Sequence, residues 1–317
     1  MAKITVDPIT RIEGHLKITA DIDENGITQD AKCHGEMFRG IEKGLEGKDA
    51  RVAQQVTQRV CGVCPYAHAE AASLALEMAM GIKPNKNGQL LKNLIIGTHQ
   101  VQDYILHFYT LCALDFIDVT AIVKYEGNNN GMNQLKKWVL SELKNNEIYP
   151  AAPFLPRYEA AYVEDKNVNI TAIQNYLESI DVMRKLHKMV AIYGAKSPHV
   201  VAIEAGGVTT MPTVDNINQY RTYLKEVAPF VTKNYVNDVL TVAKAFPEYF
   251  KIGAGYPNFL AHDFMPDENG ENHLFRGGAI IDWKYTKFDV NKITEDHTFS
   301  YYENRGNNIF KPLNSEG

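Results

Sequence analysis

One long and strongly apolar stretch, from residue 87 to residue 117, reads NGQLLKNLIIGTHQVQDYILHFYTLCALDFI. Its apolar side chains recur at spacings of three and four residues, at Leu90, Leu91, Leu94, Ile95, Val101, Ile105, Phe108 and Leu111. This spacing is typical of one face of an α-helix, and such a face is stable only when other elements cover it. The stretch therefore predicts a long helix packed inside a helical protein.

Further helices are predicted on both sides of this one. A helix-favouring composition runs from about Ala50 to Met80 and stops at Gly81, which Pro84 follows. After the turn at residues 127–131 we expect a short amphipathic helix, and then long helices over about Thr171–Tyr193 and Val214–Phe246.

The strand signals are weaker and lie mostly near the N-terminus. Residues 1–35 alternate apolar and polar side chains around turn signals at Asp7-Pro8 and Asn25-Gly26, which predicts a short strand or two and a hairpin. Residues 251–317 favour irregular structure with a few short strands. The predicted fold class is α+β and mainly α: one domain over residues 1–317, with a bundle of long helices and a small N-terminal β portion.

Composition and charge exclude several classes of protein. Of the 317 residues, 45% are apolar and 22% charged, which are ordinary values for a folded protein and argue against disorder or a coiled coil. The formal charge is -5 and basic residues do not cluster, so a nucleic-acid partner is not expected. The sequence shows no membrane-spanning run and no signal peptide, so we expect no export signal in this chain.

The main chemical signal is the segment Arg59-Val-Cys-Gly-Val-Cys-Pro-Tyr-Ala-His68. If it were helical, Cys61, Cys64 and His68 would share one face, with two soft thiolates beside an imidazole. Arg59 would favour the thiolate form, and Gly62 would let the backbone turn between the sulfurs. The pattern indicates a metal site.

Other interpretations of the cysteine pair are open. A structural zinc site needs four ligands, but Cys33 and Cys112 stand apart from each other and from the pair. A redox dithiol is expected in a βαβ context, which the surrounding sequence lacks. Two buried free cysteines at this spacing could also be a coincidence.

Polar residues elsewhere are ambiguous from pattern alone. His99, Asp103 and His107 form a polar stripe on the long apolar helix. Spacing favours a self-satisfied or solvent-facing stripe over an outer shell for a metal. Glu13, near Arg11, could belong to a plain ion pair, and Glu42 could be an ordinary surface carboxylate.

Several motifs in order resemble the N-terminal part of the large subunit of nickel-iron hydrogenases. They are Asp7-Pro-Ile-Thr-Arg-Ile-Glu-Gly-His15, Arg39-Gly-Ile-Glu42, the cysteine pair with His68, His99-Gln-Val-Gln-Asp103 and Gly194-Ala-Lys-Ser-Pro-His199. The resemblance covers nearly the whole chain, and several ordered motifs are far more specific than one C-x-x-C pair.

The resemblance implies a role for each matching residue. Cys61 would be a terminal nickel ligand, and Cys64 would bridge nickel and an iron that also binds carbon monoxide and cyanide. His68 would hydrogen-bond near the bridging thiolate. Glu13 would pass protons from the terminal cysteine. Asp103 would help to orient an arginine above the metals, and Glu42 would bind Mg²⁺.

The implied reaction is the reversible oxidation of H2 to protons and electrons. Soft thiolates suit nickel, and heterolytic cleavage of H2 needs a metal and a nearby base. Electrons would leave through iron-sulfur clusters of a separate small subunit, docked near Cys61 and His199, because this chain has too few cysteines for such clusters.

One departure from the family pattern affects these expectations. The family's C-terminal Asp-Pro-Cys-x-x-Cys-x-x-His motif is absent, so the chain offers two of four metal ligands. We expect a C-terminal part of the large subunit or a separate polypeptide to supply two more cysteines, without which the chain is inactive. Alternatives are an inactive fragment, a metal-free structural subunit related to the respiratory complex I core, and a small zinc module.

The expected location follows from the same resemblance. The motifs are most similar to the uptake type of hydrogenase, which hands electrons to a respiratory chain. The small subunit of such enzymes often carries the export signal. We therefore expect a periplasmic or membrane-associated protein, held through its partner subunits, with a cytoplasmic location as the alternative.

Overall fold

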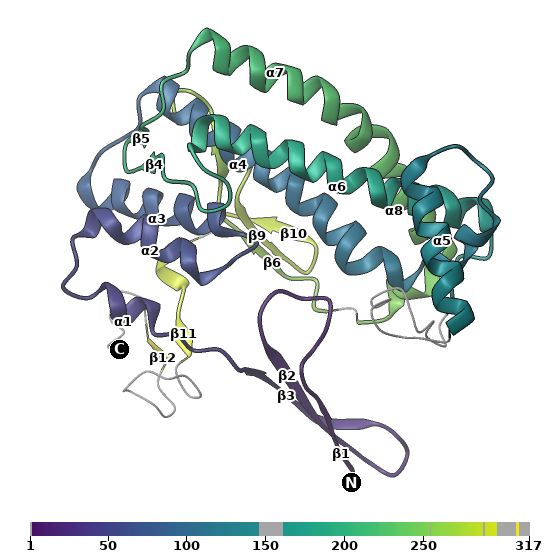
Figure 1. The fold of residues 1–317 in the computed structure, drawn as a ribbon. Coiled ribbons are helices and arrows are strands. Elements are labelled where there is room, and N and C mark those ends of the chain that lie inside the picture. The colour runs from purple at the N-terminus through teal and green to yellow at the C-terminus, as the bar shows by residue number, and fades with distance from the viewer. Residues whose placement is uncertain (1, 146–160, 254, 288, 297–308, 311–317) are drawn as a thin grey trace.

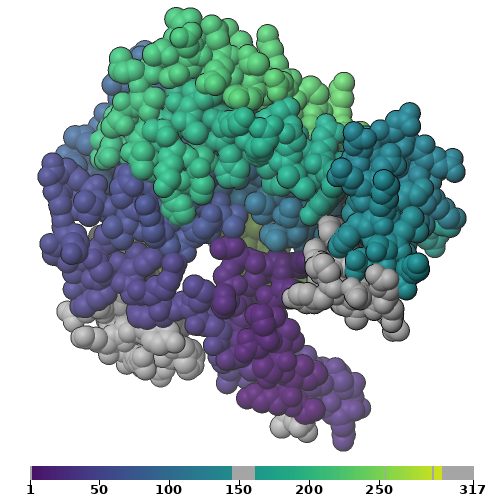
Figure 2. All heavy atoms as spheres, in the orientation of Figure 1, coloured from purple at the N-terminus to yellow at the C-terminus, as the bar shows by residue number. Residues whose placement is uncertain are grey.

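The structure is a computed structural model that describes residues 2–145, 161–253, 255–287, 289–296 and 309–310. Long helices dominate it, and an N-terminal sheet stands out from the helical body (Figures 1 and 2). This arrangement confirms the predicted class, α+β and mainly α.

The predicted central helix is confirmed and begins one residue earlier than expected. Helix α4 spans Lys86–Leu106, and the Asn85 side chain caps its start by accepting a hydrogen bond from the Gly88 N–H at 2.8 Å. The helical path then continues as a π-helical turn, η3 (His107–Cys112), and a 3-10 turn, η4 (Ala113–Asp115). Such π-helical turns locally widen a helix and often lie at functional sites.

Helix α6 (Lys166–Gly194) packs beside α4, and α7 (Val214–Pro229) packs beside α6 (Figure 1). Apolar side chains of these helices form two of the three buried clusters, which include Ile95, Ile105, Leu186 and Val190. Part of the apolar face seen in the sequence is therefore buried in these clusters, whereas Leu90 and Leu94 remain exposed.

The remaining helical segments are shorter. They are α1 (Ile41–Leu45), η1 (Ala50–Val52), α2 (Ala53–Thr57), η2 (Gln58–Val60), α3 (Pro65–Met80), η5 (Val119–Lys124), α5 (Asn130–Asn145), η6 (Phe230–Tyr235), α8 (Val236–Ala245), η7 (Pro247–Lys251) and η8 (Val290–Lys292). Helix α5 confirms the amphipathic helix predicted after residues 127–131. None of the described helices is both long and apolar enough to cross a membrane.

One predicted helix is wrong as a continuous element, and a proline explains its break. The segment 50–80 divides into short pieces and a non-helical stretch at Cys61–Cys64, because Pro65 disfavours helical geometry in the residue before it and instead starts α3. The helix predicted over 214–246 is confirmed as one helical path, in which α7 passes into the π-helical turn η6 after Pro229 and then into α8. Pro229 has no N–H to donate to the preceding turn.

The N-terminal β portion is a three-stranded antiparallel sheet. Its order is β1-β2-β3, from β1 (Ala2–Val6), β2 (Leu16–Ile22) and β3 (Thr28–Gly35). The hairpin predicted around Asn25-Gly26 joins β2 to β3.

Other strands are very short. They are β4 (Ile203–Glu204), β5 (Gly207–Val208), β6 (Phe259–Ala261), β7 (Phe264–Pro266), β8 (His273–Phe275), β9 (Gly278–Ile281), β10 (Lys284–Thr286), β11 (Glu295–Asp296) and β12 (Ile309–Phe310). Those after residue 251 agree with the weak strand signals expected there.

Candidate metal centre

The cysteine motif folds as a loop followed by a helix start, and it brings three metal-binding groups together. Cys61 is extended, Cys64 precedes the first residue of α3, and His68 lies in the first turn of that helix. The ligand atoms of Cys61, Cys64 and His68 all lie within 4.8 Å of one another. The His68 Nε2 is 3.7 Å from the Cys64 Sγ. Tertiary folding thus achieves the convergence that a continuous helix was expected to produce.

The two sulfur atoms are bonded to each other as a disulfide in this structure. A metal ion needs both as thiolates, so metal binding requires the reduced pair. The position at the start of α3 favours thiolates, because the free backbone N–H groups of a helix start attract negative charge. The Cys64 backbone N–H also donates a hydrogen bond to the Cys61 Sγ at 3.0 Å.

Arg39, for which the sequence predicted no separate role, binds the backbone just before Cys61. The Arg39 guanidinium donates to the carbonyl oxygens of Arg59, at 2.7 Å, and of Val60. On the other side, the Gln58 side chain donates to the Val200 carbonyl at 2.9 Å. These bonds attach the turn just before Cys61 to segments that are far away in the sequence.

Three of the predicted site residues, Glu13, Glu42 and Asp103, lie outside this group. Glu13 is exposed, in the bend between β1 and β2, and Glu42 is exposed, in the first turn of α1. Arg11, next to the first of them, makes a forked interaction with Asp115 at 2.9–3.3 Å. None of the three carboxylates belongs to the metal-binding group found among the described residues.

The polar stripe on α4 passes from the core to the surface. His99 is buried and its ring lies 4.4 Å from that of Tyr66, whereas Asp103 is half-buried and His107 exposed. Burial lowers the pKa of His99 to about 4, so its imidazole is neutral at pH 7. Burial raises the pKa of Asp103. The His99 Nε2 and an Asp103 carboxylate oxygen are 4.0 Å apart, too far for a direct hydrogen bond.

These two side chains line a cavity of about 220 Å³ between α3 and α4, together with Glu70 and His262. The cavity begins one turn beyond Cys64, because Ala67 also lines it. The structure therefore places Asp103 on the cavity wall and not in the cluster of metal-binding atoms.

A buried charged group next to this cavity was not predicted. Lys92 is fully buried, and its ammonium lies 2.9 Å from Glu77, 3.0 Å from Ser73 and 3.7 Å from Glu70. Burial raises the pKa of Glu70, which Lys92 counteracts only in part. The sequence contains a pattern that could have predicted this group. Lys92 falls on the apolar face of the helix between Leu91 and Ile95, where a charged side chain needs buried partners.

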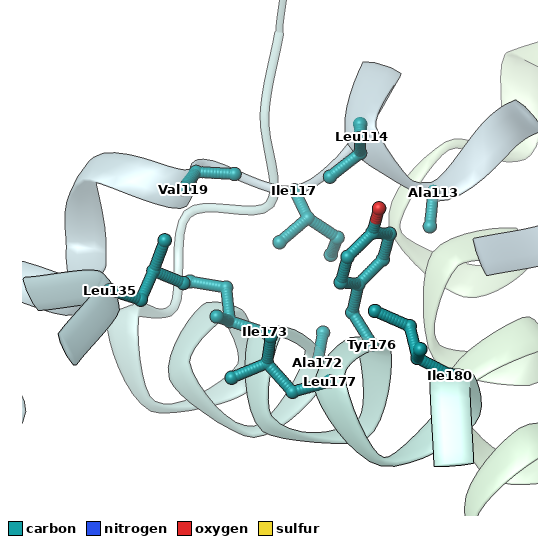
Figure 3. A pocket seen from close by; sticks show the side chains of 10 residues that line it. All are labelled: Ala113, Leu114, Ile117, Val119, Leu135, Ala172, Ile173, Tyr176, Leu177 and Ile180. Carbon is teal, nitrogen blue, oxygen red and sulfur yellow. The ribbon is translucent and has the colours of Figure 1, made fainter. Parts of the chain in front are cut away.

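A second cavity, of about 240 Å³, is apolar and lies between α6 and the segment that follows α4 (Figure 3). Tyr176 has the only polar side chain that lines it, and the other lining side chains are hydrocarbon: Ala113, Leu114, Ile117, Val119, Leu135, Ala172, Ile173, Leu177 and Ile180. This lining offers no cysteine, histidine or carboxylate side chain to a metal.

Comparison with known proteins gives two family matches. A family model described as nickel-dependent hydrogenase matches residues 39–316, and one described as HoxL-like matches residues 3–34. Among curated relatives, the periplasmic NiFeSe hydrogenase large subunit of Desulfomicrobium baculatum is 34% identical over 311 residues. The quinone-reactive Ni/Fe-hydrogenase large chain of Wolinella succinogenes is 34% identical over 329 residues. Each match covers 95% of this chain but only 55–56% of the relative.

Solved structures show the same partial coverage. A reduced, active form of the Ni-Fe-Se hydrogenase from Desulfomicrobium baculatum superposes with a TM-score of 0.84 at 34% identity, over 99% of this chain and 61% of the other. The Ni-Fe-Se hydrogenase from Desulfovibrio vulgaris Hildenborough, as isolated and oxidised, gives 0.80 at 37% identity, over 95% and 57%. The chain therefore spans only about half the length of the curated relatives that it matches.

Proposed function

The chain belongs to the nickel-dependent hydrogenase family, and from this premise we propose that it supplies half of a nickel-iron centre for the reversible oxidation of H2. The observation that carries the proposal is the convergence of Cys61, Cys64 and His68 at the start of α3. Two sulfur donors and one imidazole suit nickel and iron better than Mg²⁺ or Ca²⁺. The donor set thus fits the metal that the family name gives.

In this proposal each site residue has a separate task. Cys61 and Cys64, when reduced, would hold the centre: Cys61 would be a ligand of nickel, and Cys64 a ligand of nickel and of an iron with carbon monoxide and cyanide. When bound, such a centre supplies the place where H2 binds and where its electrons are taken up. A cysteine thiolate accepts the proton, because a base next to the reacting bond is needed for heterolytic cleavage.

The carboxylates and His68 act around the thiolates. Glu13 receives the proton from the thiolate and passes it outward, and His68 steadies the Cys64 thiolate. Support for the His68 assignment is the 3.7 Å separation between its Nε2 and the Cys64 Sγ. Asp103 orients a positively charged group above the metals, and Glu42 binds Mg²⁺.

The proposed protein is an assembly, in which residues 1–317 form one domain of the large subunit. Another stretch of polypeptide supplies two further thiolates, since nickel-iron sites in this proposal need four and Cys33 and Cys112 lie outside the metal-binding group. An iron-sulfur small subunit docks near Cys61 and His199 and carries the electrons away. Burial, and then the positive charges of Arg59 and Lys196, lower the pKa of His199.

We propose a periplasmic or membrane-associated location through the partner subunits. Support comes from the relatives, one of which is named as a periplasmic hydrogenase subunit and another as quinone-reactive.

The nickel content of the protein tests the proposal. The chain should be purified without oxygen together with the polypeptides that accompany it, and nickel measured by mass spectrometry of the metals. We expect about one nickel per chain, as in a single completed thiolate site. Zinc in place of nickel, or no metal in an intact assembly, would contradict the proposal.

Glu13 offers a separate test of proton transfer. The change Glu13→Gln keeps the size of the side chain and removes its acid-base function, so the metals should remain while proton exchange slows. We expect exchange between H2 and D2O to fall about 10²–10⁴-fold, the usual effect of a positioned acid-base group. Glu24→Gln, at an exposed turn of the same sheet, is the control. Undiminished exchange in Glu13→Gln would refute the assigned role.

A further inference from the structure

The N-terminal sheet has one apolar face and one polar face. Cross-strand pairing places Ile4 with Ala20 and Ala31, and Val6 with Ile18 and Cys33, on one side of the sheet. Leu16 and Ile22 lie on the same side, because side chains alternate along a strand. We call this side the apolar sheet face.

The opposite face is polar and its groups contact one another. Thr19 and His34 are hydrogen-bonded at 3.1 Å. Lys17 pairs with Glu36 at 2.6 Å, beyond the end of β3. A face of this kind is stable in water without a partner.

The apolar sheet face lacks a comparable cover among the described residues. None of its side chains belongs to the three buried apolar clusters. Ile4 and Val6 each keep 47% of their surface exposed, and Cys33 is exposed as well. Amphipathic sheets are normally stabilised by burying the apolar side, so this side is built to be covered.

The sheet is also held in place and is not a free arm. The Arg11 guanidinium, between β1 and β2, donates to both carboxylate oxygens of Asp115 at the end of η4. The sheet stands out from the helical body (Figure 2). This ion pair links the sheet to the helical body across 104 positions of the sequence.

We propose that the apolar sheet face is the docking surface for the polypeptide that completes the large subunit. This inference rests on the proposed function, which requires such a polypeptide. In the Desulfomicrobium structure the matched part is only 61% of that chain, so the relative has a substantial further part that could cover such a face. A mainly apolar face is typical of a permanent interface, whereas transient partners use more polar surfaces.

Site-specific photo-crosslinking tests the identity of the occupant. A benzophenone amino acid is placed at position 4, in place of Ile4, and in a matched control at position 5, in place of Thr5. The neighbouring side chains of a strand point to opposite faces, so the control differs only in the face that it probes. The tagged chain is purified with its companions, irradiated, and the linked peptides are sequenced.

We expect the position 4 probe to link, several-fold more than the position 5 probe, to a polypeptide that contains a further Cys-x-x-Cys pair. Links to a second copy of this chain, or to the iron-sulfur subunit, would overturn the proposal. Equal yields from both positions would also overturn it, because they would show that the two faces are equally accessible.

The unaltered chain contains its own reporter, which avoids the risk that a variant misfolds. Cys33 lies on the apolar sheet face, so its alkylation by iodoacetamide should be fast in the isolated chain and many-fold slower in the assembly. A Lys32→Cys variant in a Cys33→Ser background places a thiol on the polar face, where alkylation should stay fast in both. Unchanged reactivity of Cys33 in the assembly would overturn the proposal.

These readouts are independent of nickel. Crosslinks at position 4 in a metal-free assembly would keep this inference and contradict the proposed function. A nickel-loaded assembly with freely reactive Cys33 would do the reverse.

Discussion

Replacing Cys64 by serine is expected to remove nickel from the assembled protein completely and to abolish H2 oxidation with it. Cys64 lies where the loop meets α3, and its sulfur is near both Cys61 and His68. Serine keeps the size and the helix start, but its hydroxyl is a hard, protonated donor that binds nickel poorly. We expect nickel to fall from about one per chain to the background level.

The control for Cys64→Ser is Cys112→Ser. Cys112 is a free, half-buried thiol near His107, outside the metal-binding group. Nickel content and activity should be unchanged in this control. The prediction fails if Cys64→Ser retains stoichiometric nickel while the chain stays folded, as judged by circular dichroism.

Replacing Lys92 by alanine is expected to destabilise the fold more than changing any surface charge. Lys92 and its partners Glu77 and Glu70 are all less than a tenth exposed, so the change leaves buried carboxylates without a counter-charge. Breaking a buried ion pair on one side typically costs about 3–5 kcal/mol of unfolding free energy. Urea denaturation of the reduced chain measures this difference.

The matched control for Lys92→Ala is Lys185→Ala. Lys185 also lies 3.1 Å from each of two carboxylates, on Asp181 and Glu226, but both partners are nearly half exposed. Its loss should cost only about 0–1 kcal/mol, because water replaces the lost partner. Equal losses in the two variants would contradict the argument from burial.

The Lys92→Ala effect should depend on pH in a defined direction. Burial raises the pKa of Glu70 above its unfolded value, so the folded state holds this proton more tightly than the unfolded state. The stabilisation from this proton is present at low pH and is lost as pH rises through the folded pKa. Without Lys92 the penalty for ionising Glu70 grows, so the variant should be least stable at alkaline pH.

Local patterns predicted most of the elements correctly. The apolar periodicity of residues 87–117 predicted α4, and alternation around Asn25-Gly26 predicted the β2-β3 hairpin. Pro65 also indicated a break in the sequence, but the many helix-favouring residues on either side of it led to the prediction of one continuous helix. The choice of Cys61, Cys64 and His68 as the chemical centre rested on residue type and spacing alone.

Contacts between distant segments could not be predicted in this way. Periodicity shows which face of a helix is buried, but it does not show which side chain from another segment will meet that face. The Arg39 bonds to the carbonyls of Arg59 and Val60 join the segment before α1 to η2, about 20 positions further along the chain. The tether between Arg11 and Asp115 joins residues 104 positions apart.

For this protein, then, residue type and spacing specified the helices, the hairpin and the kind of atoms offered to a metal. The arrangement of those atoms in space came from packing, because a loop and not a helix carries the two cysteines. The charges around Lys92 also acquire their large energetic effect only in the packed core. Water screens them in the unfolded chain, whereas burial removes that screening and makes each partner necessary.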